Sequence, residues 1–176
     1  MNPTVKSIGL NYGLYLGAFF ILITGIIYAV DLDIFLNWWL RILFFIIAIG
    51  TGVVAAMKIR SQLGGYISFK DAFTGFFLTM VVSTVLSTIV SIVLFAVIDP
   101  EAAQYLNEQI LIQTKEMMER WNTPQEIMIS ELEKARDKDN FSVGNQSFGM
   151  LISFIFYAIF GLIVALIVKR KNPDEE

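Results

Sequence analysis

"GLNYGLYLGAFF", residues 9–20, places Gly9, Gly13 and Gly17 at a strict four-residue spacing inside an apolar run. Residues four apart lie on the same face of a helix, and glycine is costly inside a helix because its backbone has more freedom to lose. Three glycines on one face are typical of membrane helices that pack closely, since small residues let two backbones approach. The stretch therefore predicts a transmembrane helix held tightly against a neighbour.

The chain as a whole is apolar enough to cross a membrane several times. Of its 176 residues, 56% are hydrophobic and 16% are charged, and the mean hydropathy is +0.64. A membrane-spanning helix needs about 20 apolar residues, and the runs 8–30, 38–57, 72–98 and 148–168 each reach that length. We expect an all-α, polytopic membrane protein with four transmembrane helices.

The segments between these runs suggest the domain organisation. Residues 1–98 hold three transmembrane helices with short loops, residues 99–147 form an acidic segment, and residues 148–176 hold the fourth helix and a basic then acidic tail. Asp99 before Pro100 is typical of a helix start, and Thr123 with Glu126 has the spacing of a capping box. An amphipathic helical hairpin is therefore expected between the third and fourth transmembrane helices, within one membrane domain.

Basic residues near short loops predict the orientation, because they cross membranes poorly. Seven of them lie in the amino terminus, the middle loop and the tail, whereas residues 99–147 carry ten acidic and five basic residues. We expect both termini in the cytoplasm and residues 99–147 outside it. Trp38, Trp39 and Arg41 then serve as interface anchors; the alternative for Arg41 is binding an anionic headgroup or substrate.

Small residues form further ridges on the third and fourth membrane helices, again at four-residue spacing. Such ridges predict a compact bundle, although the Ser/Thr face of the third helix could instead line a pore or a polar cavity. The residues expected at helix–helix contacts are Gly9, Gly13, Gly17, Gly75, Thr79, Ser83, Ser87, Ser91, Ser153 and Gly161.

One face of the acidic segment is apolar and is a possible partner surface. It could pack within the hairpin and on the bundle, or meet a protein partner or a second copy of the chain. An anionic bilayer surface is disfavoured by the ten acidic residues. The apolar residues concerned are Leu106, Ile110, Met117, Trp121 and Leu132.

The composition excludes several kinds of chemistry. The chain has neither cysteine nor histidine, which removes thiolate catalysis, Ser-His nucleophiles and the usual zinc and haem ligands. The carboxylates of residues 99–147 lack the spacing of a calcium loop. We therefore assign no catalytic residue, no metal and no cofactor, and we expect no nucleic-acid partner; a carboxylate-only metal site or acid/base pair stays open.

"GYISFKDAF", residues 65–73, is the most motif-like stretch, and Gly75 and Phe76 follow it closely. Ser68 and Asp71 resemble a helix cap. With the four apolar helices and the charged segment before the last one, this stretch resembles a bacterial membrane family known only as domain of unknown function 4199. The resemblance implies a bacterial membrane protein and assigns no activity. Together with the orientation predicted from the charges, it leads us to expect a multi-pass protein of the bacterial inner membrane with residues 99–147 in the periplasm.

These observations favour a non-enzymatic membrane protein that binds a partner or acts as a scaffold subunit. One alternative is a small transporter or channel lined by the Ser/Thr face of the third helix. Against ion coupling, three of the four apolar runs lack charged residues at membrane depth. A second alternative, implied by the resemblance, is an accessory subunit of a polyprenyl-lipid glycosyltransferase.

Overall fold

The computed structural model describes residues 1–170, so the acidic end of the expected tail, at 171–176, lies outside the described residues. Four helices are long and apolar enough to cross a membrane, and the predicted all-α fold with four such helices is confirmed. The elements in chain order are α1 (Pro3–Val30), the 3₁₀ helix η1 (Leu32–Leu36), α2 (Trp38–Gln62), α3 (Phe69–Ile92), the π-helix η2 (Val93–Ile98), α4 (Pro100–Arg120), α5 (Gln125–Arg136) and α6 (Val143–Val168).

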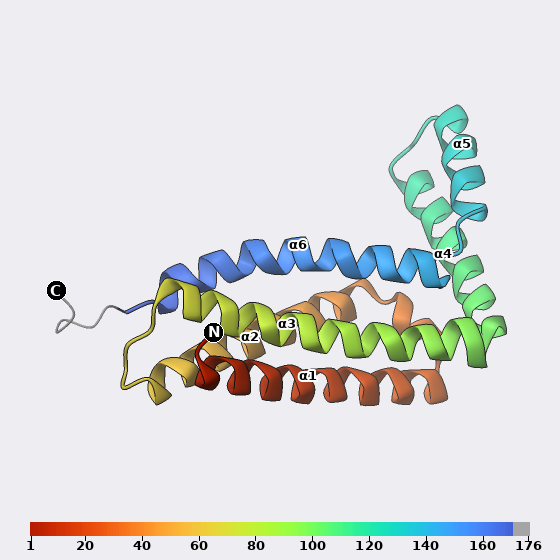
Figure 1. The fold of residues 1–176 in the computed structure, drawn as a ribbon. Coiled ribbons are helices and arrows are strands. Elements are labelled where there is room, and N and C mark those ends of the chain that lie inside the picture. The colour runs from red at the N-terminus through yellow and green to blue at the C-terminus, as the bar shows by residue number, and fades with distance from the viewer. Residues whose placement is uncertain (171–176) are drawn as a thin grey trace.

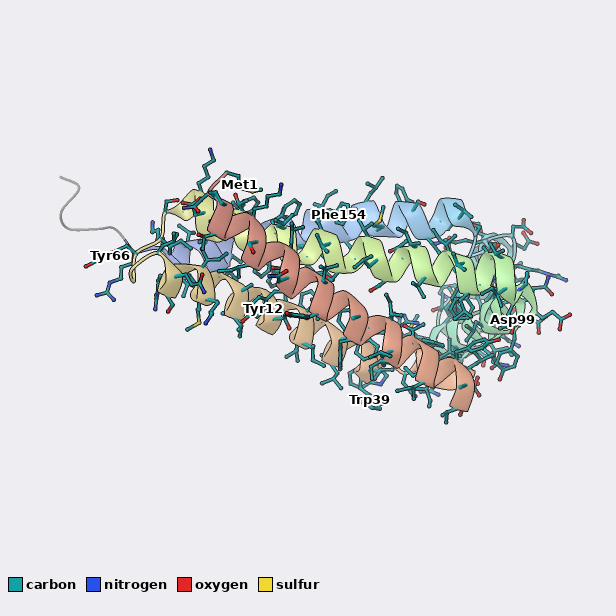
Figure 2. The ribbon with its side chains drawn as sticks, turned by 60° about the horizontal axis from the view of Figure 1, so that its bottom comes forward. Met1, Tyr12, Trp39, Tyr66, Asp99 and Phe154 are labelled. Atoms are coloured by element: carbon teal, nitrogen blue, oxygen red, sulfur yellow. The ribbon has the colours of Figure 1, made fainter. Side chains whose placement is uncertain are left out.

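The four long helices α1, α2, α3 and α6 form an elongated bundle, with α3 in contact with each of the other three (Figure 1). Met1 and Tyr66 lie at one end of this bundle and Asp99 lies at the other (Figure 2). We call these the loop end and the hairpin end. Fully buried side chains along α3, such as Phe76 and Met80, make it the central helix of the core.

Local sequence signals set the loop end. The Oγ of Ser68 accepts a hydrogen bond of 3.0 Å from the N–H of Asp71 and donates one of 2.8 Å to its carboxylate, so the expected cap of α3 is confirmed. Gly64 and Gly65 adopt φ values of 78° and 91°, which side chains other than glycine rarely tolerate. The loop then pairs Ile67 with Arg170 through two backbone hydrogen bonds of 3.0 Å, which fastens it to the end of α6.

At the hairpin end the chain turns sharply from α3 into α4. The π-helix η2 ends with a hydrogen bond of 2.8 Å from the N–H of Asp99 to the carbonyl of Leu94. The Asp99 side chain caps α4 by accepting from Ala102 N–H, and Pro100 occupies the first turn, so the predicted start of this helix is confirmed. Figure 1 shows α4 running crosswise to the bundle, with α5 packed beside it.

Two helix starts differ from the sequence-based expectation. The capping box expected at Thr123 and Glu126 is wrong, because Pro124 occupies the cap position of α5 and no side chain bonds to that helix start. The last membrane helix begins at Val143, before its apolar run, because the Ser142 side chain caps it by accepting from Asn145 N–H at 3.3 Å.

A second, smaller core joins the hairpin to the bundle. Leu36 of η1 and Phe95 of η2 pack there against Ala103 and Leu106 of α4. Phe141, in the connection to α6, closes this core, with its ring centroid 5.0 Å from that of Phe95. The first half of α4 is therefore part of the bundle, whereas its second half extends beyond it.

Candidate interaction surfaces

The three glycines of α1 lie directly against α3. A Cβ added at Gly13 would stand 2.7 Å from the Cβ of Val82 and 3.0 Å from the carbonyl oxygen of Thr79. At Gly9 it would approach the carbonyl oxygen of Gly75 to 3.2 Å, and at Gly17 the Cα of Ser83 to 3.3 Å. Since backbone atoms are among the nearest neighbours at all three positions, no larger residue fits without separating the two helices.

The hydroxyl groups of α3 are used in this packing. Thr79 Oγ1 donates 2.9 Å to the carbonyl of Gly75 and lies 3.3 Å from that of Gly9 in α1. Ser83, also buried, donates to the carbonyl of Met80 at 3.0 Å, and Ser87 donates to that of Ser83 at 2.8 Å. Bonding to carbonyls of the same helix is how membrane helices satisfy hydroxyls without water.

Side-chain contacts join α3 and α6 at two levels of the bundle. Ser91 Oγ and Gln146 Oε1 are 2.6 Å apart in a hydrogen bond that links these two helices. Phe77 and Phe154 stand between the same helices, with ring centroids 6.4 Å apart.

The ridge on α6 makes close contact at Gly161, toward the loop end. A Cβ added at Gly161 would meet the rings of Phe76 and Phe73 at 3.0 and 3.1 Å. Ser153, in contrast, bonds back to the carbonyl of Gly149, where an added Cβ would meet nothing within 4 Å. Ser153 is half-buried and its hydroxyl bonds within its own helix, so tight packing at this position stays a prediction.

Sequence reasoning missed a small-residue ridge on α2. A Cβ at Gly52 would stand 2.6 Å from ring atoms of Phe76 and 2.9 Å from the terminal carbon of Met80. Ala48 and Ala56, four residues to either side, are buried as well. The four-residue spacing that marks α1 and α3 is present here too, but it includes only one glycine and no hydroxyl.

The expected interface anchors lie at the hairpin end of α2, in its first turn. Trp38, Trp39 and Arg41 all point away from the protein interior and are exposed. Figure 2 places Trp39 toward the same end of the bundle as Asp99. An exposed indole at the end of an apolar helix fits the interfacial layer of a bilayer.

Two tyrosines that the sequence does not single out tie the hairpin to the bundle. The Tyr28 hydroxyl donates 2.7 Å to Asp99, and that of Tyr105 donates 2.8 Å to Asp33. The hydrogen bond from Tyr28, with one from the Ala102 N–H, lowers the pKa of Asp99. The bond to Asp33 raises the pKa of Tyr105. The only sequence signal for these two hydrogen bonds is that a tyrosine and an aspartate are each placed near a helix end.

The predicted partner surface of the hairpin divides into buried and exposed parts. Leu106 is fully buried in the second core and Ile110 packs against it, so of the alternatives for this face, packing on the bundle holds for these two residues, and Leu106 is not available as a partner surface. The Leu106 side chain faces the bundle because α4 crosses the end of the bundle. Met117 and Trp121 are exposed, whereas Leu132 is half-buried in the groove described next.

A shallow groove of about 350 Å³ runs between α4 and α5. Its surface is mostly apolar, and Leu111, Ile112, Ile129 and Leu132 supply the apolar side chains. Lys115, Glu133 and Arg136 complete the lining.

A second hollow, of about 410 Å³, lies where η2, α4 and residues 136–141 meet. Arg136 and Lys138 line it together with Asp137 and Asp139, so its charges are mixed. Asp139 already accepts from Asn107 at 2.9 Å. Within residues 1–170, no group of three or more acidic side chains is placed to hold a metal ion.

The chain matches a known family over most of its length. A family model described as "Protein of unknown function (DUF4199)" matches residues 11–170, which include all four long apolar helices and the hairpin. No curated protein and no solved structure matches the chain.

Proposed function

The chain belongs to the DUF4199 family of proteins of unknown function, and we propose that it is a non-enzymatic membrane scaffold that binds a partner protein through its helical hairpin. The observation that carries the proposal is the apolar groove between α4 and α5, on the part of the hairpin that extends past the bundle. The four-helix bundle acts as the anchor and the hairpin as the binding element.

The bundle supports this proposal because its packing is close. The hydroxyls of Thr79 and Ser83, which a pore through α3 would need, are buried and bonded to carbonyl groups. Buried and satisfied hydroxyls favour a static anchor over a transporter lined by this face. The accessory-subunit alternative is carried by the family resemblance alone.

The hairpin supports the proposal because it is incompletely covered. No residue of α5 is buried, although Ile127 and Ile129 are large and apolar. A helix of 12 residues has marginal stability by itself and depends on contacts with other elements. A partner segment that fills the groove would supply such contacts, and we propose that it comes from another membrane protein, since the groove lies beside the end of the bundle.

The proposed orientation places both termini in the cytoplasm of a bacterial cell and the hairpin in the periplasm. Lys6 in the first turns of α1, Lys58 near the end of α2 and Lys70 at the start of α3 all belong to the loop end. Arg60 is there as well, with Nη1 3.5 Å from the carbonyl of Val168. This clustering supports a cytoplasmic loop end under the positive-inside rule.

Site-specific photocrosslinking in native membranes tests the partner proposal. A photoreactive residue at Ile129, in the groove, should give a discrete adduct whose mass identifies one other protein. The matched control is a photoreactive residue at Ser130, which is exposed on the same helix but does not line the groove. Identical adducts from both positions, adducts with lipid alone, or an adduct of two copies of this chain would contradict the proposal.

A further inference from the structure

The tryptophans point to a second interaction surface, on a face of α4 that does not line the groove. The chain has three tryptophans. Trp38, Trp39 and Trp121 are 72%, 52% and 73% exposed, and all three belong to elements at the hairpin end. Indole rings prefer the interfacial layer of a bilayer to either water or hydrocarbon. Trp38 and Trp39 begin a membrane helix, so their position is explained, whereas Trp121 ends a helix outside the bundle and its exposure requires another explanation.

The helical period of α4 gives the direction in which Trp121 faces. Leu106 and Ile110 lie on the side of α4 that packs onto Phe95 and its neighbours at the end of the bundle. Met117 follows Leu106 by three turns, which places it about 20° around the axis and about 16 Å further along. Trp121 follows Ile110 by the same interval. Met117 and Trp121 therefore continue, beyond the protein core, the face that looks toward the membrane-spanning part of the molecule.

The position of the hairpin determines what this face meets. Figure 1 shows α4 crossing the hairpin end of the bundle and extending past α6. Among residues 1–170, no helix of the bundle lies beneath α4 past α6 (Figure 1), so Met117 and Trp121 face the region where lipid beside α6 would lie. Phe148 and Leu151, near the start of α6, are exposed as a lipid-facing surface should be.

The charges of α4 are compatible with this placement. Glu108 and Glu119 lie about 160–180° around the axis from Met117, so they face away from the membrane. Glu119 and Glu116 are also paired with Lys115 and Arg120, at 3.8 and 3.4 Å. The acidic residues that disfavour binding to an anionic surface therefore do not oppose contact through the opposite, apolar face.

We infer that α4 lies along the bilayer surface at the hairpin end, with Met117 and Trp121 inserted among the headgroups and upper acyl chains. Contact with the bilayer comes from burial of apolar side chains and from the amphipathic indole ring of Trp121. A bilayer of zwitterionic phospholipid is therefore sufficient for this contact. This inference goes beyond the proposed partner binding, because its occupant is lipid and its residues are not those of the groove.

Fluorescence of Trp121 in phosphatidylcholine vesicles tests the inference. The full chain carrying Trp38→Phe and Trp39→Phe retains Trp121 as its single tryptophan. Its emission should lie at shorter wavelength than that of an indole in water, and brominated acyl chains should quench it. Acrylamide dissolved in the water should quench it several-fold less than it quenches a tryptophan on the opposite face.

The matched control adds Trp121→Phe and Glu119→Trp to the same background, which moves the indole to the water-facing side of α4. Equal acrylamide quenching at both positions, without quenching by brominated lipid, would overturn the inference. Protection of Trp121 from both quenchers would overturn it too, because the ring would then be buried against protein. If the background variant does not fold, the difference between the unmodified chain and Trp121→Phe alone gives the same readout.

Discussion

The hydroxyl of Tyr28 donates a hydrogen bond of 2.7 Å to Oδ2 of Asp99, which joins the end of α1 to the corner between α3 and α4. The other oxygen of the same carboxylate accepts from Ala102 N–H at 2.9 Å and caps α4. One side chain therefore determines where the hairpin begins and also fastens it to the bundle. The attachment of the hairpin should depend on this carboxylate staying ionised.

Acid should release this attachment. The hydrogen bond from Tyr28, and then that from the Ala102 N–H, lower the pKa of Asp99 below its ordinary value of 3.8. A carboxylate with a lowered folded-state pKa contributes stability above its unfolded pKa and loses it as the pH falls through the folded value. The protection of α4 amides from hydrogen exchange, relative to the intrinsic rate at each pH, should therefore fall as the pH drops below 3.8.

Tyr28→Phe removes the largest cause of the lowered Asp99 pKa, so the protection of α4 amides from exchange should be lost at a higher pH than in the unmodified chain. Tyr15→Phe is the matched control, because Tyr15 is a largely exposed tyrosine of the same helix. An unchanged pH profile in Tyr28→Phe would show that the hydrogen bond does not stabilise the ionised carboxylate.

Leu106→Ala should detach the hairpin more strongly than any exposed substitution in it. Leu106 is fully buried, and truncating a buried leucine costs about 2–5 kcal/mol. The loss should be seen as faster proteolysis of residues 99–142 in detergent, with the bundle intact. Ile112→Ala, at a half-exposed position of the same helix, serves as the control and should be close to neutral. Equal proteolysis of the two variants would contradict the second core.

Gly52→Ala should destabilise the bundle, whereas Gly50→Ala should not. The added Cβ at Gly52 would stand 2.6 Å from the ring of Phe76, and at Gly50 it would meet nothing within 4 Å. Overpacking of this kind costs about 1–3 kcal/mol. Unfolding in increasing fractions of a denaturing detergent measures the difference, and a Gly52→Ala variant as stable as Gly50→Ala would show that α2 is not closely packed there.

Several parts of this fold could be predicted from the sequence because their signals are local. Four long apolar runs determine the number of membrane helices, and Ser68 and Asp99 carry their own capping partners within three residues. In each case the residues that act together are near one another in the chain. Spacing and composition are then sufficient.

The parts that could not be predicted depend on distant residues. Tyr28 meets Asp99 across 71 positions, and the orientation of Leu106 depends on the angle at which α4 crosses the bundle. The four-residue spacing of α6 predicts a contact at Gly161, but it does not predict that the rings of Phe73 and Phe76 of α3 make that contact. The spacing of small residues therefore identifies one face of a helix, but it does not give which helix packs on that face or how closely.

The close approach of α1 to α3 is tested most directly by placing the same substitution at two glycines of α1. Gly13→Leu brings a Cβ to 2.7 Å from that of Val82, while Gly25→Leu places it in open space. Leu14→Ile, at a half-exposed neighbour, controls for changes in side-chain shape. The measurement is the unfolding free energy of each variant in detergent. The unfolding free energy of Gly13→Leu should fall by about 1–3 kcal/mol, whereas those of Gly25→Leu and Leu14→Ile should stay near that of the unmodified chain. Equal stability of Gly13→Leu and Gly25→Leu would contradict the close approach of α1 to α3.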